Sequence, residues 1–218
     1  MVISICDAIN VPLRERNHLL VAAGFAPRYR ESSFDEPELA MVEKALDMIL
    51  TAHDPYPAMV VDRLYNIQRA NSGGMRLVAL LYGCAEPTQM PEFAGNAMRG
   101  LFHPKGFRDK IANWEELAVF LLRRLQGDLH AHGGPPELEQ LIRELERYDG
   151  VPKNWRHGAL GEWQAPMVTF DIRTEAGTLS FFSTIATLGT PQDIALQEIH
   201  IESMFPANEA TAAFFREN

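Results

Sequence analysis

The clearest hydrophobic pattern in the chain lies near its C-terminus, in two segments rich in β-branched and aromatic residues. Within residues 166–174, Val168, Phe170 and Ile172 alternate with polar residues, which is typical of a strand with one buried face. Residues 179–187 are apolar on both faces, so we expect a central strand that is covered on each side. Gly177 lies in the turn between the two segments, which predicts an antiparallel hairpin.

A third C-terminal strand and a second hairpin complete the predicted sheet. The third strand is expected over residues 195–205, with Leu196 toward the core. Residues 58–62 and 67–70 are two further extended runs separated by a turn, and Asn71 can cap the helix that follows. This order resembles the first hairpin and helix of PAS sensory domains. The fold class is therefore expected to be α+β: a PAS-like antiparallel sheet covered by helices, with a short N-terminal helical segment.

Amphipathic periodicity predicts helices through most of the remaining chain. In the N-terminal part we expect helices at 2–9 and at 13–23, with Gly24 after the end of the second, and then one capped by Asp35 with an apolar stripe from Leu39 to Leu50. In the middle of the chain we expect helices at 72–82 and 96–102, one running from Trp114 through Leu125, and one carrying Leu138 to Tyr148. The last expected helix is 208–216, capped by Asn208. In the helix near Leu138, Glu139 and Arg143 are spaced to pair across one turn.

Composition and charge limit the classes of partner. A chain of 218 residues with 46% hydrophobic content fits one large domain, or one domain with an appendage. The net charge of -9 argues against this chain binding nucleic acid or an anionic membrane by itself, although residues 1–30 carry a net +2. We find no signal peptide and no run long enough to span a membrane, so a cytoplasmic protein is expected. Cys6 and Cys84 match no metal or redox spacing and are expected to be buried free thiols.

Catalytic and metal sites are weakly supported. The two histidines of the segment 128–132, His130 and His132, could be metal ligands on a strand, but they fall at a helix C-terminus, where a cation suits the helix dipole. Ser180 and Ser183 lie in a predicted strand without a nucleophile elbow, and Asp171 and Glu175 have no obvious partner. The sequence contains no Walker loop and no Gly-x-Gly-x-x-Gly motif. We therefore expect no enzyme, no resident cofactor and no metal.

Several short motifs in a fixed order resemble one known family. They are VPLRERN at residues 11–17, LVAAGF at 20–25, PA-x-VVD at 57–62, Asn66, Asn71, His103-Pro104, Asn113-Trp114, LSFFS at 179–183 and AT-x-GTP at 186–191. In these residues the chain resembles the ligand-binding region of MmyB-like transcription regulators of the XRE helix-turn-helix class. The resemblance covers nearly the whole chain.

The resemblance implies a domain division and a set of partners. It implies that residues 1–24 are the tail of a helix-turn-helix domain, residues 25–57 a connector and helix, and residues 58–218 a PAS-like ligand-binding domain. The recognition helix should lie upstream of this sequence, so DNA contact is expected only through that missing head. The family also implies homodimeric regulators and a small-molecule effector, with fatty acid as one ligand type.

A pocket is expected between the sheet and the helices that start at Ser72 and Trp114, with a volume of roughly 300–1,000 Å³. The candidate lining residues are Leu77, Phe102, Trp114, Leu117, Leu121, Phe170, Phe182 and Thr184. For any single one of them, ordinary core packing is also an explanation, because apolar stripes at helical spacing normally serve packing. Arg99 could pair with a ligand carboxylate or be a solvated surface arginine, and Asn113 could contact a ligand or cap a helix.

Three functional hypotheses remain open at this stage. The first is the effector-sensing part of a DNA-binding regulator, in which a ligand alters the helix at residues 11–24. The second is a lipid- or small-molecule-binding module without a regulatory role. The third is an enzyme on an α+β scaffold.

Overall fold

The structure is a computed structural model of the 218-residue chain. It describes residues 1–32, 36–83, 89–131, 133–156, 167–175 and 177–217. Cys84, His132 and Asp35, which the sequence analysis named, lie outside the described residues.

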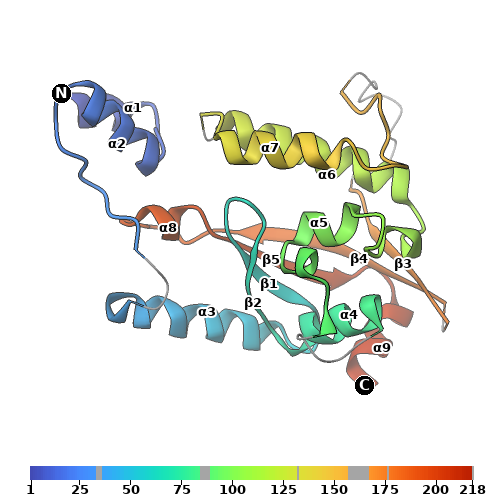
Figure 1. Ribbon diagram of the computed structural model, residues 1–218. Coiled ribbons are helices and arrows are strands. Elements are labelled where there is room, and N and C mark those ends of the chain that lie inside the picture. Colours follow the sequence, from blue (N-terminus) through green and yellow to red (C-terminus); the bar gives the residue numbers. More distant parts are fainter. Residues whose placement is uncertain (33–35, 84–88, 132, 157–166, 176, 218) are drawn as a thin grey trace.

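A five-stranded antiparallel sheet forms the centre of the fold (Figure 1). Its strands are β1 (Ala58–Val61), β2 (Ile67–Ala70), β3 (Phe170–Thr174), β4 (Gly177–Ala186) and β5 (His200–Pro206), in the order β2-β1-β5-β4-β3. The N-terminal hairpin and the C-terminal meander therefore join along β1 and β5. Both the α+β class and this PAS-like division of the sheet are confirmed.

The helices begin largely where the capping residues predicted them. They are α1 (Val2–Ala8), α2 (Leu13–Ala22), α3 (Ala40–His53), α4 (Ser72–Tyr82), α5 (Ala97–Phe102), α6 (Trp114–Ala131), α7 (Pro136–Leu145), α8 (Ile194–Gln197) and α9 (Glu209–Glu217), with 3₁₀ turns at Pro37–Leu39, Glu92–Gly95 and Arg108–Lys110. The side chains of Asn71, Asn96 and Asn208 each accept a hydrogen bond from a backbone N–H in the first turn of the helix that follows. Glu139 and Arg143 pair in α7 at 2.6 Å, as the spacing predicted.

Two predictions about the meander are wrong. The third strand starts at His200 and not at residue 195, because Asp193 accepts a hydrogen bond from the Ala195 N–H and begins the short helix α8. Leu196 is nevertheless buried. β4 is not covered on both faces along its length, since residues 183–186 are exposed. The helix α3 packs over β1 and β5 and leaves that end of β4 uncovered.

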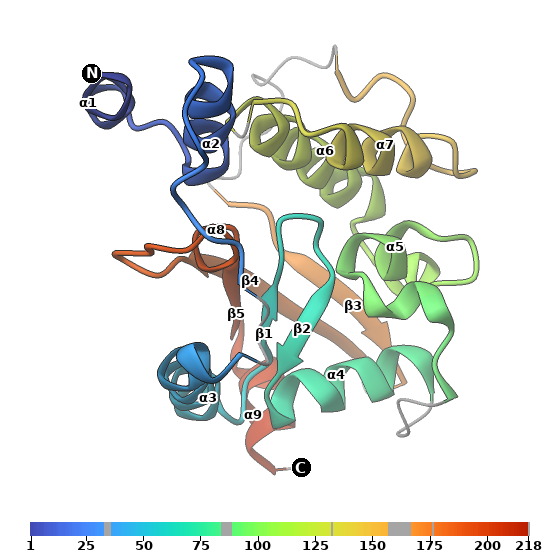
Figure 2. The ribbon, with the colours of Figure 1, turned by 60° about the vertical axis from the view of Figure 1, so that its left-hand side comes forward.

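The two faces of the sheet carry separate cores (Figures 1 and 2). On one face, Leu46 and Leu50 of α3 pack against Val60 and Ile201. Val61, the next residue of β1, belongs to the larger core on the other face, which α4, α5, α6 and α7 cover. The candidate site lies in this larger core.

The N-terminal helices α1 and α2 form a pair beside α8, away from the C-terminal helix (Figure 1). Asn10 makes the corner between them with a positive φ of 52°. The side chain of Cys6 is buried and not in a disulfide. Among the described residues, the helices are all too short or too polar to cross a membrane.

Candidate functional site

A cavity of about 110 Å³ lies between the sheet and the helices α4, α5 and α6. Its wall is mostly apolar and includes Met59, Leu77, Leu81, Leu117, Leu121, Phe170, Phe181 and Met204. The cavity is where the sequence placed a pocket, but it is well below the expected range of roughly 300–1,000 Å³. The rings of Phe170 and Phe181, which both line the cavity, lie with their centroids 6.5 Å apart and their planes tilted by 38°.

Two charged side chains interrupt the apolar wall. Nη2 of Arg124 in α6 lies 3.5 Å from Oε2 of Glu202 in β5, and the two side chains are 13% and 11% exposed. Burial is the largest single influence on the pKa of Arg124 and lowers it, but Glu202, Tyr65 and Asp128 together raise this pKa above its ordinary value. Nη2 of Arg124 makes no hydrogen bond to the described residues, so it keeps a donor for a ligand.

Tyr65 supports Arg124 from the β1–β2 turn. The Arg124 guanidinium lies over the Tyr65 ring, 5.1 Å from its centroid. The Tyr65 hydroxyl donates a hydrogen bond of 2.5 Å to Oδ2 of Asp128, one turn further along α6. Burial raises the pKa of Tyr65 above its ordinary value, so the hydroxyl remains a donor at neutral pH. Arg124 is therefore held in place by an aromatic ring and a carboxylate.

Of the nine candidate ligand residues, five line the cavity and four do not. The five that line the cavity are Leu77, Leu117, Leu121, Phe170 and Phe182. The ring of Phe182 stacks on Phe205 at 5.3 Å, so only part of this residue borders the cavity. Phe102 is fully buried and packs against Trp114, whose indole N–H donates to Gly150 O at 2.7 Å. Thr184 is exposed at the uncovered end of β4, since its side chain alternates away from the cavity.

Arg99 binds protein and not the cavity. Its guanidinium donates to both carboxylate oxygens of Glu144 in α7, at 2.9 Å from Nε to Oε1 and 2.9 Å from Nη2 to Oε2. These hydrogen bonds lower the pKa of Glu144, and Tyr148 adds a third one at 2.7 Å. Arg99 is thus neither the solvated arginine nor the ligand anchor that the sequence left open.

Asn113 also has a role that neither alternative described. Its side-chain amide donates to Thr169 O at 2.7 Å, and its carbonyl oxygen accepts from the Asp171 N–H at 3.3 Å. The residue therefore fastens the start of α6 to β3. Among the described residues, we find no group of three His, Cys, Asp or Glu side chains that could hold a metal ion; His132, one of the metal ligands considered from the sequence, lies outside those residues.

Sequence reasoning missed the polar part of the wall, namely Asn96, Arg124 and Glu202. A signal for Arg124 was present, because it follows Leu117 by seven residues and Leu121 by three and so lies on the same helix face. Glu202 gives no comparable signal, since an acidic residue in a strand normally points to solvent.

A comparison with protein families places most of the chain in one of them. Residues 42–217 match the sequence model of the family described as MmyB-like transcription regulator ligand binding domain. The matched segment contains all five strands and the entire cavity wall. No curated protein matches the chain.

Proposed function

The chain belongs to the MmyB-like transcription regulator ligand binding domain family, and from this premise we propose that its cavity senses a small effector with an apolar body and an anionic head, such as a fatty acid. The observation that carries the proposal is the composition of the cavity wall. Apolar side chains surround the space, and Arg124 is the one basic residue among the lining residues. A carboxylate is the ligand group that best matches a guanidinium donor.

The size of the cavity limits the ligand. A volume of about 110 Å³ suits a short-chain acid; a medium-chain acid such as octanoate already requires the wall to move, and a long-chain acid requires a larger movement. The aromatic side chains at the sheet are the part of the wall that would have to rearrange. We therefore expect octanoate or a shorter acid to bind before the long-chain acids do.

The regulatory setting is part of the same proposal. We propose that α1 and α2 end a helix-turn-helix head, that DNA is bound through this head, and that the regulator acts as a homodimer. Support comes from the family membership and from the position of α2, which packs on α8 directly before β5 of the sensing sheet.

Native mass spectrometry of the purified protein, followed by solvent extraction, is the first test. A stoichiometric carboxylic acid would support the proposal and identify the chain length. Calorimetric titration with octanoate and with octanol then separates the head group from the apolar body. Binding of octanol as tightly as octanoate would contradict an anionic anchor at Arg124.

A blocked cavity provides the control. Leu121→Trp places a larger side chain in the cavity wall and should abolish octanoate binding, while Leu121→Met conserves the volume and should retain it. Circular dichroism and thermal unfolding show whether both variants are folded. If folded Leu121→Trp protein still binds octanoate, this cavity is not the site.

A further inference from the structure

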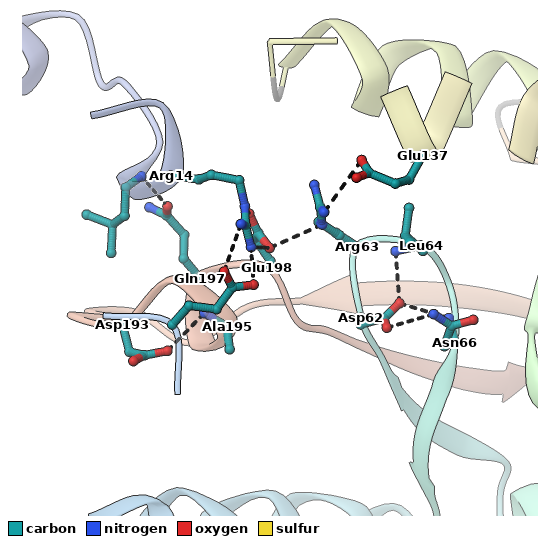
Figure 3. Close-up of polar contacts among 12 residues, drawn as sticks. Arg14, Asp62, Arg63, Leu64, Asn66, Glu137, Asp193, Ala195, Gln197 and Glu198 are labelled. Atoms are coloured by element: carbon teal, nitrogen blue, oxygen red, sulfur yellow. Dashed lines mark hydrogen bonds and ion pairs between the residues drawn. The ribbon is translucent and has the colours of Figure 1, made fainter. Parts of the chain in front are cut away.

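We propose that Glu198 passes the state of the cavity to the N-terminal helix pair, because two arginines from distant parts of the chain compete for its carboxylate. Arg14 comes from α2 and Arg63 comes from the β1–β2 turn, and both reach Glu198 directly after α8 (Figure 3). The inference rests on the proposed sensing function and adds the route by which an effector would act on the N-terminal segment.

Arg14 is the main polar anchor of α2 on the domain. Its Nε donates to Oε1 of Glu198 at 2.7 Å and its Nη2 donates to Oε2 at 2.9 Å. The adjacent Leu13 N–H donates to Oε1 of Gln197 at 2.6 Å (Figure 3). Glu198 is only 8% exposed, so the strength of this docking depends on how well its buried charge is matched.

Arg63 competes for the same carboxylate. Its Nε lies 3.5 Å from Oε2 of Glu198, and its Nη2 lies 3.6 Å from Oε2 of Glu137 in α7. The two guanidinium groups repel each other across the carboxylate that they share. Moving Arg63 toward Glu198 therefore weakens the hold of Arg14, and moving it toward Glu137 strengthens that hold.

The turn that carries Arg63 is internally fixed. Oδ1 of Asp62 accepts hydrogen bonds from the N–H groups of Leu64 and Asn66 at 2.8 and 2.9 Å. Its Oδ2 accepts from the Asn66 side-chain amide at 2.8 Å (Figure 3). With both carboxylate oxygens used in this way, the turn moves as a unit, and any displacement of it displaces Arg63.

The same turn is attached to the cavity wall. Asn96, which lines the cavity, donates from its side chain to Leu64 O at 2.7 Å. The N–H of Ala97, its neighbour in the wall, donates to Tyr65 O at 2.9 Å. Arg124 lies over the Tyr65 ring. A ligand that repositions any of these wall residues therefore shifts the turn and alters the competition at Glu198.

Hydrogen exchange of the α2 amides in the full chain tests the competition. Glu198→Gln should speed their exchange about tenfold, because α2 loses its charge-assisted anchor. Arg63→Gln should slow it about threefold, because Arg14 then has no competitor. Arg69→Gln is the matched control: Arg69 lies on β2 of the same hairpin and pairs with α3, so the same charge change should leave α2 unaffected. Faster or unchanged exchange in Arg63→Gln would overturn the proposal.

A second set of measurements tests the connection to the cavity. Octanoate should change the hydrogen exchange of α2 in the wild type and not in Arg63→Gln, although both proteins should bind octanoate equally. If bound octanoate leaves the exchange of wild-type α2 unchanged, the route from the cavity to α2 is refuted. Asn96→Ala provides a test without ligand, since it should alter α2 exchange in the wild-type background and not in Arg63→Gln. Equal effects in both backgrounds would refute the route. If octanoate binds neither the wild type nor the variants, the ligand proposal fails. The Asn96→Ala comparison still tests the route through Glu198, because it needs no ligand.

Discussion

Arg124 and Glu202 form an ion pair of 3.5 Å in the wall of a mostly apolar cavity, with both side chains nearly buried. An anionic ligand that approaches Arg124 must compete with Glu202 for it. Under the proposed function, this pair would affect both the stability of the empty domain and its affinity for a carboxylate.

Glu202→Gln should strengthen octanoate binding about tenfold, because it removes the negative charge that competes with the ligand. Isothermal titration calorimetry measures the change. Glu209→Gln makes the same charge change at a side chain that is 84% exposed, and it should have no effect. Unchanged or weaker binding in Glu202→Gln would show that the ligand head does not bind at Arg124.

Arg124→Met should destabilise the fold by about 3–5 kcal/mol, since it leaves Glu202 buried without its cation. Adding Glu202→Leu should recover most of this loss, because neither member of the pair then leaves a buried charge without its partner. Urea unfolding of the two single variants and the double variant gives the coupling energy. Additive losses would mean that the ion pair is not the origin of the effect.

Gly73→Ala should destabilise the protein by about 2–4 kcal/mol. A Cβ at this position in α4 would lie 2.3 Å from Pro55 O and 2.6 Å from Tyr56 C, both of them backbone atoms. Gly127 in the interior of α6 has no atom within 4 Å of such a Cβ, so Gly127→Ala should stabilise by about 0.5–1 kcal/mol. The midpoints of urea unfolding should therefore shift in opposite directions.

Asn71→Ala should lower the free energy of unfolding by about 3 kcal/mol or more, because this one buried side chain makes four hydrogen bonds. Its Oδ1 accepts from the Ala58 and Gly74 N–H groups, and its Nδ2 donates to Tyr56 O and Leu50 O. Asn208→Ala removes a helix cap whose side-chain hydrogen bonds, among the described residues, go only to Thr211 and should cost about 1 kcal/mol. Similar losses in thermal unfolding would show that the tertiary bonds of Asn71 contribute little.

Glu144→Gln should reduce stability at pH 7 and have progressively less effect as the pH falls below about 4.5. The hydrogen bonds from Arg99 lower the folded-state pKa of Glu144, so the stabilisation is present above the unfolded-state value and is lost as the pH falls through the folded-state value. Urea unfolding of the wild type and of Glu144→Gln between pH 7 and pH 3 measures the difference in their free energies of unfolding. A difference that is constant across this range would contradict an ionic role. Octanoate binding should be unaffected, since Arg99 and Glu144 lie outside the cavity lining.

The sequence by itself determined most of the elements and their order, although it missed α8. Alternation found β3, side-chain caps located α4 and α9, and the period of 3.6 residues placed Leu117 and Leu121 on the buried face of α6. These features depend on residues a few positions apart, so a local pattern records them. The motifs also pointed to the family that residues 42–217 match.

Only the tertiary structure decided which polar groups meet. Arg124 pairs with Glu202, Arg99 pairs with Glu144, and Arg14 pairs with Glu198, which lies 184 positions away in the sequence. Arg99 and Arg14 are consistent with solvated surface positions when their own helices are considered alone, and Arg124 lies on the buried face of α6 without any indication of its partner. The partners of all three are set by the packing of helices on the sheet. Local periodicity carries no information about such long-range contacts.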